Sequence, residues 1–173
     1  MRDIAIDTET SGVSPLEGAE IIRLSACELL APDQVGRVFH QLLKPSLPLH
    51  SDVAYISGLT DAVLESAPRF EDIADSFLTF IEGARLICSR ANWERNFLNA
   101  ALDKAGKPIL PADRFHDLWD HVPSELKGKG SSVIYEYAGV EQGAFPPTEQ
   151  MAQSPSDLYE IVQVYWKICD CRA

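Results

Sequence analysis

Two carboxylates separated by a single residue follow the first apolar run of the chain. Asp7 and Glu9 come directly after Ile4-Ala5-Ile6, a segment typical of a β-strand. Side chains at alternate strand positions point to the same face, so these carboxylates are expected to lie side by side. Like charges that close repel each other unless a cation lies between them. The pair is therefore either a metal site or an acidic strand end exposed to water, and the residue types alone leave both open.

The strands that must position this pair are predicted from apolar runs bounded by polar turns. Three adjacent strands are expected: Arg2 to Asp7, Glu20 to Leu30, and Val35 to Leu43. The turns between them are short, which favours antiparallel pairing. A further short and buried strand is expected from Arg85 to Ser89.

Helices are predicted where apolar residues recur at helical spacing. They are expected after Thr60, which is suited to be an N-cap, from Phe70 to Ile81, and from Trp93 to Ala105. Ser131 or Ser132 is expected to cap a further helix that runs through Ala138-Gly139, and a final helix is expected from Asp157 to Cys169. Phe115 to Trp119 is a brief apolar segment, whereas Glu141 to Pro155 has no periodicity and is expected to form a long loop. A strand between two helices indicates an α/β layer architecture.

Length and composition favour one globular unit. The chain has 173 residues, of which 46% are hydrophobic, so a single domain over residues 1–173 is expected. No run approaches the roughly 18 apolar residues of a membrane span, and a signal peptide has no room before the first strand. A soluble, cytoplasmic protein is expected. The four cysteines lack metal-binding spacing and are expected to be free thiols.

The formal net charge of -11 bears on the kind of partner. It argues against a protein that holds duplex DNA through many basic contacts to phosphate. It does not exclude a nuclease that works through divalent cations, because such a site needs local negative charge to hold the ions.

Several segments, in order along the chain, resemble the motifs of the DnaQ-like 3′–5′ exonucleases. They are Ile4 to Gly12 with Glu20-Ile21-Ile22 (first motif), Phe39 to Pro45 (third strand), Ala54 to Thr60 (the substrate-facing "HGIT" turn), Ser89 to Leu98 ("HNAxFDxxFL"), Ser131 to Ile134 (the "SLD" helix start) and Asp157 (third motif). Any one of these matches is weak, but together they span nearly the whole chain.

The resemblance implies an RNase H-like mixed β-sheet flanked by α-helices, with four acids that bind two divalent metal ions. These acids are Asp7, Glu9, Glu94 and Asp157. Carboxylate oxygens favour Mg²⁺ or Mn²⁺. Two ions about 4 Å apart can clamp the attacking and leaving oxygens of a phosphodiester and acidify a bound water. The resemblance also assigns substrate binding to Thr10, Ser57, Arg90 and Trp93.

The chain departs from the family pattern at the general base. The family's histidine variant has His five residues before the third-motif aspartate, where this chain has Ala152, and the tyrosine position is Gln153. His116 and His121 are the histidines that could replace this base, although either could equally be a surface or packing residue. Loss of a general base typically costs about 10²–10⁴ in rate.

Other departures lie in the second motif and the "HGIT" turn. The turn histidine is Ser57, the His-Asn of the second motif is Ser89-Arg90, and the aspartate is Glu94. Trp93 replaces the family's aromatic residue, either to stack on an unpaired base or as a core residue. Arg90 could contact phosphate or simply be solvated.

Two hypotheses of different classes follow. The first is a metal-dependent 3′–5′ exonuclease acting on single-stranded DNA or RNA ends, with a possible polymerase or nuclease-complex partner. The second is a catalytically impaired relative that serves as a nucleic-acid-binding or protein-interaction module. Metal binding discriminates between them, because a scaffold has no need of a repulsive carboxylate cluster.

Overall fold

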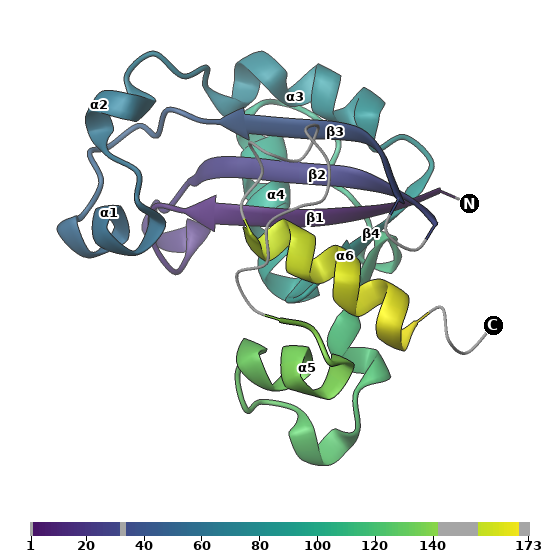
Figure 1. Cartoon of the computed structure of the whole chain (residues 1–173). Helices are drawn as coiled ribbons and strands as arrows, with labels where there is room; N and C mark the ends of the chain where they lie inside the picture. Colours follow the sequence, from purple (N-terminus) through teal and green to yellow (C-terminus); the bar gives the residue numbers. More distant parts are fainter. Residues whose placement is uncertain (1, 32–33, 142–155, 170–173) are drawn as a thin grey trace.

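Five strands form one mixed sheet in the order β3-β2-β1-β4-β5 in the computed structural model, which describes residues 2–31, 34–141 and 156–169. The strands are β1 (Arg2–Thr10), β2 (Ile21–Ala31), β3 (Gln34–Leu42), β4 (Ala84–Cys88) and β5 (Phe115–Asp117). The first three pair antiparallel, as predicted from their short turns. β4 pairs parallel to β1 and β5 pairs parallel to β4. The RNase H-like mixed sheet expected from the resemblance is thus present (Figure 1).

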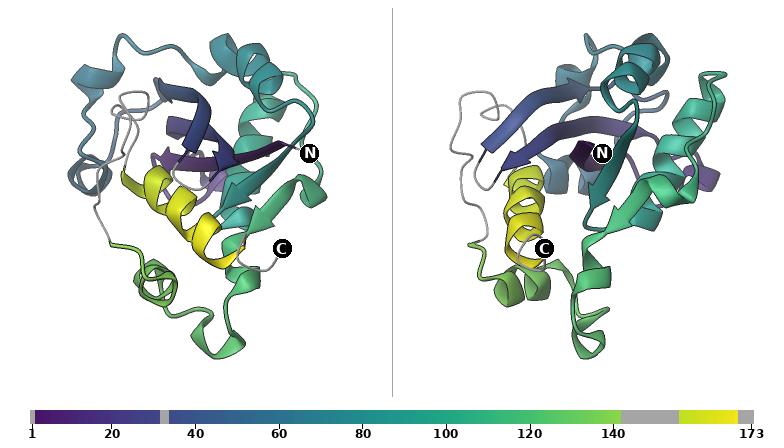
Figure 2. Two further views of the ribbon diagram at one scale, coloured as in Figure 1. Left: turned by 45° about the vertical axis from the view of Figure 1, so that its right-hand side comes forward. Right: turned by 90° about the vertical axis from the view of Figure 1, so that its right-hand side faces the viewer.

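Helices cover both faces of this sheet. They are α1 (Ser51–Ser57), α2 (Asp61–Leu64), α3 (Phe70–Phe80), α4 (Ala91–Lys104), α5 (Ser131–Ala138) and α6 (Ser156–Ile168), with 3₁₀ turns η1 (Pro15–Glu17), η2 (Ala112–Arg114), η3 (Leu118–His121) and η4 (Ser124–Leu126). In Figure 1, α6 lies in front of the strands and α4 lies behind them, and the turned views of Figure 2 separate the two layers.

The alternation of β1 explains why each face has its own core. Ile4 and Ile6 are fully buried in the cluster formed with α3 and α4. Ala5, between them, is buried in a second cluster formed with α5 and α6. Because strand side chains alternate, Asp3, Ala5, Asp7 and Glu9 share the face covered by α6. The sheet therefore presents the two leading carboxylates to the α6 layer.

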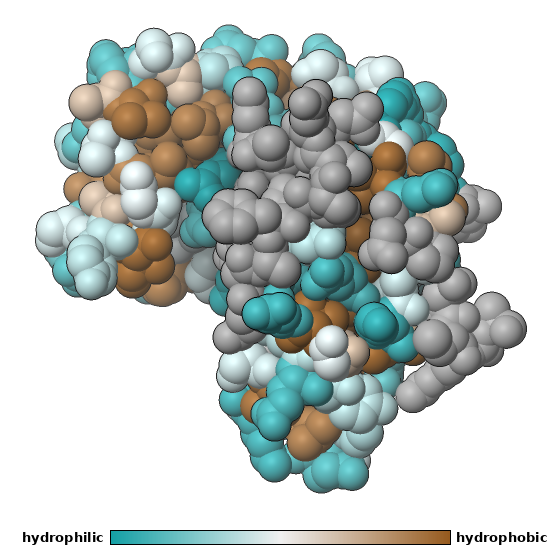
Figure 3. Space-filling model, viewed as in Figure 1, coloured by the Kyte–Doolittle hydropathy of each residue, from teal (hydrophilic) through white to brown (hydrophobic). Residues whose placement is uncertain are grey.

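Three elements differ from the predictions. Helix α1 was not expected, and its sequence carries no apolar stripe; Tyr55 and Ile56 are 90% and 80% exposed. Apolar side chains gather on the surface over α1 and α2 (Figure 3). The brief apolar segment after Arg114 is a fifth strand, β5, rather than an isolated segment. Helix α5 has Gly130 at its N-cap with no side-chain cap, so the predicted capping by Ser131 or Ser132 is wrong.

Two smaller predictions concern cysteines and membranes. Cys27, Cys88 and Cys169 are free thiols in the described part of the chain, and Cys171 lies outside it. No described helix has the length and apolar character that crossing a membrane requires.

Candidate active site

The first two predicted ligands lie at the carboxyl end of β1. Asp7 is 8% exposed and pairs in register with Ser25 of β2, and Glu9 pairs with Arg23. Parallel pairing places the end of β4 beside this part of β1, since Ala5 is opposite Ile87. Helix α4 begins at Ala91, three residues after β4 ends. The sheet thus brings the start of α4 next to the acidic end of β1.

Glu94 enters the site from the first turn of α4. It is 1% exposed, and its pKa is raised well above the ordinary 4.5, first by burial and then by the negative charge of Asp7. Its Oε2 makes no hydrogen bond within the described part of the chain. Thr8 and the positive charge of Arg90 lower the pKa of Glu94. Thr8 Oγ1 is itself buried and makes no hydrogen bond within the described residues. Glu94 and Asp7 thus form a buried pair of acids.

Helix α6 brings the fourth predicted ligand toward the same end of β1. Tyr165, in its last turns, donates a hydrogen bond from Oη to Asp3 Oδ2 at 2.6 Å. Asp157 precedes Tyr165 by eight residues, or about 12 Å of helix. Asp7 follows Asp3 by four strand residues, or about 13 Å. Helix α6 starts toward the carboxyl end of β1 (Figure 1), which is the end of the strand that carries Asp7 and Glu9.

The described side chains alone do not complete a metal site. Among residues 2–31, 34–141 and 156–169, no three His, Cys, Asp or Glu side chains come together as a group that could hold a metal ion. The side chain of Asp157 lies outside this description. The carboxylates of Glu94 and Asp7 fit a divalent cation. One buried oxygen of Glu94 makes no hydrogen bond within the described residues, and the Asp7 carboxylate is nearby. Such carboxylate oxygens are the hard donors that Mg²⁺ and Mn²⁺ prefer.

The residues assigned to substrate binding all lie near this end of the fold but are engaged within the chain. Thr10 Oγ1 donates to Gly12 O at 2.7 Å, and Ser57 Oγ donates to Val53 O at 2.7 Å. The Arg90 guanidinium lies 4.7 Å from the ring centroid of Trp93, which packs against Phe97 at 4.9 Å. Trp93 is half-buried against the α3–α4 core, so it is at least partly a packing residue.

The two histidines considered as replacement bases lie elsewhere. His116 and His121 line a small cavity together with Tyr165 and Cys169, at the C-terminal end of α6. Asp157 lies at the opposite end of that helix. The cavity that holds these histidines is therefore at the end of α6 away from Asp157. Ala152, Gln153 and Pro155 lie outside the described residues.

Two polar groups near the acids were missed by the sequence reasoning. Ser25, fully buried and in register with Asp7, shares a 2.9 Å hydrogen bond with His40 Nδ1. Burial, and to a lesser degree the charge of Arg23, lowers the pKa of His40. Asp7, Ser25 and His40 are far apart in sequence, so their alignment across the three strands could have been predicted only from the strand register. The second group, Asp117, accepts a hydrogen bond from Ala91 N at the start of α4.

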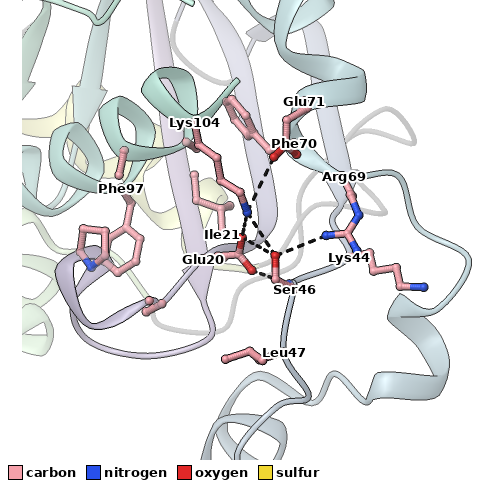
Figure 4. Close-up of a pocket in the computed structure, with 15 residues that line it drawn as sticks. Glu20, Ile21, Lys44, Ser46, Leu47, Arg69, Phe70, Glu71, Phe97 and Lys104 are labelled. Atoms are coloured by element: carbon pink, nitrogen blue, oxygen red, sulfur yellow. Dashed lines mark hydrogen bonds and ion pairs between the residues drawn. The ribbon is translucent and has the colours of Figure 1, made fainter. Parts of the chain in front are cut away.

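A cavity of about 360 Å³ lies beside the second half of α4 and is a separate feature (Figure 4). Phe97, Phe70 and Ile21 line it with other apolar residues, and none of the four predicted ligands does. Polar side chains link its walls: Lys104 contacts Glu20, Arg69 Nη1 donates to Ser46 Oγ at 3.4 Å, and Lys104 Nζ donates to Ser46 Oγ at 3.1 Å. This network ties the segment after β3 to α4.

Comparison with known proteins decides the family. The exonuclease family model RNase_T matches residues 4–151, which is most of the chain. The chain belongs to this exonuclease family. The resemblance to the DnaQ-like 3′–5′ exonucleases is thereby confirmed.

Curated sequence relatives of the chain include subunits of DNA polymerase III. The chain is 32% identical over 123 residues to DNA polymerase III subunit epsilon of Buchnera aphidicola subsp. Schizaphis graminum, covering 69% of this chain and 53% of the relative. The same subunit of Rickettsia felis is 36% identical over 102 residues, covering 59% and 44%. The chain thus spans about half the length of these curated relatives.

Solved structures of exonucleases share the fold. A 3′-exonuclease that recognises the histone mRNA stem-loop superposes with a TM-score of 0.77 at 16% identity, covering 98% of this chain and 82% of the other. Exonuclease X in complex with 5′ overhanging duplex DNA gives 0.69 at 16% identity, covering 98% and 92%. At such low identity, these neighbours establish the mixed sheet flanked by helices and no more.

Proposed function

We propose that this protein is a metal-dependent 3′–5′ exonuclease that removes nucleotides from single-stranded DNA or RNA ends. The observation that carries the proposal is the buried carboxylate of Glu94, whose Oε2 makes no hydrogen bond within the described residues and whose pKa is raised by burial and then by the charge of Asp7. A buried carboxylate normally has a partner of opposite charge. In a nuclease of this family, that partner would be a bound divalent cation.

Each predicted ligand has a role that its position supports. Asp7 and Glu9, on one face of β1, would bridge two Mg²⁺ or Mn²⁺ ions. Glu94 would complete the shell of the second ion, and Asp157 would hold the ion that activates water. When bound, the two ions would polarise the scissile phosphate and lower the pKa of a bound water. The protein's own part would be to present carboxylates from β1, α4 and α6 to these ions.

The proposal also covers the general base. With Ala152 at the family's histidine position, no side chain there can accept a proton near pH 7. We therefore expect slow turnover, reduced by about 10²–10⁴ relative to an enzyme with that base. The activity that remains would depend on the acidity of the metal-bound water.

The possible partner is inferred from the relatives, and the location is inferred from the cysteines. The curated relatives are subunits of DNA polymerase III, which supports a polymerase as a possible partner of this chain. We propose a cytoplasmic location as well, since buried free thiols such as Cys27 and Cys88 suit a reducing compartment.

The test uses single strands of DNA and RNA labelled at either end, incubated with Mn²⁺, Mg²⁺ or EDTA. Shortening from the 3′ end that needs metal and is lost in Asp7→Asn would support the exonuclease. Glu136→Gln, which neutralises an exposed carboxylate on α5, is the matched control and should retain activity. Intact substrates in every lane would reject the enzyme.

The catalytically impaired module remains the second candidate, favoured by the residues that replace family histidines. Ser57, one of them, uses its hydroxyl inside the chain, donating to Val53 O and accepting from Leu59 N at 3.2 Å. Calorimetric titration with Mn²⁺ separates the candidates. Metal binding without strand cleavage would favour an impaired enzyme, whereas absence of both would favour the interaction module.

A further inference from the structure

The start of α4 lacks a cap from its own residues. Arg90 occupies the N-cap position and makes no side-chain hydrogen bond to the helix, because its guanidinium has only donors and cannot accept from the N–H groups. The guanidinium lies over the ring of Trp93. Helix starts leave backbone N–H groups without intrahelical acceptors, and a buried N–H needs one. The acceptor for Ala91 N has to come from elsewhere in the fold.

Asp117, at the end of β5, supplies this acceptor from 26 residues away. Its Oδ2 accepts from Ala91 N at 2.9 Å, and its Oδ1 accepts from Trp119 N, also at 2.9 Å. In the parallel β4–β5 pair, Asp117 is in register with Cys88, three residues before α4 begins. Both carboxylate oxygens are therefore used to join the end of β5, the start of η3 and the start of α4.

This carboxylate lies close to the buried acids. The pKa of the Cys88 thiol is raised first by burial and then by three negative charges, those of Glu94, Asp117 and Asp7. Asp117 is thus near the pair while its oxygens point to backbone N–H groups. Glu94 follows Ala91 by three residues, less than one helical turn, so a shift of the helix start would move Glu94 by a similar amount.

We propose that Asp117 is a positioning residue that holds the Glu94 carboxylate opposite Asp7 by fixing the start of α4. It acts through the backbone of α4 and touches neither metal nor substrate. The inference rests on the proposed function, because it treats Glu94 as a metal ligand. Partners that orient metal ligands typically change metal affinity by about 10- to 100-fold when removed.

The test compares Asp117→Ala and Asp117→Asn with a matched loss of another cap, Asp72→Ala. Asp72 Oδ2 accepts from Arg69 N at 2.9 Å at the start of α3, a helix that carries none of the predicted ligands. Each alanine variant removes a capping carboxylate, so each is expected to lower Tm by about 2–4 °C or more. Loss of stability alone therefore does not distinguish them.

The deciding measurement is Mn²⁺ affinity by calorimetry, which needs no turnover. Asp117→Ala is expected to weaken Mn²⁺ binding about tenfold, whereas Asp72→Ala leaves it unchanged. Asp117→Asn keeps one acceptor oxygen and should lie between wild type and Asp117→Ala. In cleavage assays, saturating Mn²⁺ should restore kcat of Asp117→Ala, and KM for a single strand should not change.

Equal Mn²⁺ affinity in wild type, Asp117→Ala and Asp72→Ala would overturn the inference and leave Asp117 as an ordinary helix cap. If Asp117→Ala does not fold, the same comparison is made with Asp117→Asn, for which wild-type affinity is the contrary result. Failure of the proposed function is recognised differently, because the wild type itself would then bind no Mn²⁺ and shorten no strand. That outcome would reject both proposals.

Discussion

Two buried glutamates on neighbouring elements have opposite surroundings. Glu28 of β2 is 9% exposed and is held by two arginines: Arg37 Nη2 lies 2.7 Å from its Oε1, and Arg2 contacts the same oxygen. Arg37 and Arg2 lower the pKa of Glu28 to about 2, chiefly through side-chain hydrogen bonds from Arg37. Glu94 faces the carboxylate of Asp7, and its pKa is raised. The difference teaches that the chain holds Glu28 with arginines that lower its pKa, whereas burial and the charge of Asp7 leave the pKa of Glu94 raised, a setting that favours a cation.

The largest expected effect separates the two glutamates by activity. Glu94→Gln removes a predicted metal ligand and should reduce 3′-end cleavage in Mn²⁺ by about 10²–10⁴-fold. Glu28→Gln neutralises the other buried glutamate, which is held by arginines and is not a predicted metal ligand, and this variant should cleave like wild type. Initial rates on a 5′-labelled single strand measure both. Similar losses in the two variants would mean that charge or stability, rather than metal ligation, explains the effect.

The next effect separates them by stability. Glu28→Gln should lower the free energy of unfolding by about 1–2 kcal/mol at pH 7, a modest value because the arginines are 39% and 61% exposed. Because the pKa of Glu28 is depressed when folded, its stabilisation is present above the ordinary 4.5 and is lost as the pH falls toward 2. Urea titrations should therefore show the difference from wild type at pH 7 and its disappearance near pH 2.

Glu94→Gln should have the opposite effect on the metal-free protein. The pKa of Glu94 is raised in the fold, so its contribution to stability is present below 4.5 and is lost as the pH rises through the folded value. Glu94→Gln should thus raise Tm in EDTA, by about 2–4 °C near pH 8, and change little at pH 4. Mn²⁺ should reverse the order, because it stabilises the wild type by binding to the folded state. A lower Tm for the variant in EDTA would argue that the charge of Glu94 is already stabilised in the metal-free protein.

The smallest effect tests another buried acid, Asp3, which resembles Glu28 in having an arginine partner. Arg85 Nε donates to its Oδ1 at 2.6 Å, and Tyr165 Oη donates to its Oδ2 at 2.6 Å. Tyr165→Phe removes only the second bond and should cost about 0.5–1.5 kcal/mol of unfolding free energy. Tyr137→Phe, at a tyrosine that is 41% exposed, is the control and should change little. Equal effects at the two tyrosines would show that the Asp3 hydrogen bond adds nothing.

Local patterns were enough to predict most of the sheet. Strands β1 to β3 follow from apolar runs bounded by short polar turns, and α3, α4 and α6 follow from helical spacing. Helix α1 was missed because its burial is slight and its stop signal, Gly58 with φ near +67°, looked like part of a turn. Strand β5 was missed because three residues are too few to show a period, and only pairing with β4 makes it a strand.

The candidate site was predictable only in part, for a physical reason. Asp7 and Glu9 were predicted as ligands from their spacing, and Glu94 from its place in a motif. The role of Asp117 depends on a hydrogen bond to Ala91, 26 residues away, and the row of Ser25 and His40 depends on strand register. Such contacts arise from the tertiary arrangement, so no local pattern encodes them.

The parallel pairing of β1 with β4 has a consequence for the order of folding. The β1–β2–β3 meander joins strands that are close in sequence, whereas Ile4 of β1 pairs with Leu86 of β4, 82 positions later. Closing so long a loop costs more chain entropy and slows contact formation. We therefore expect the meander to form first and the β1–β4 pair to form late. Asp7 and Glu94 would then meet only in the last stage of folding, when enough of the core exists to bear their repulsion.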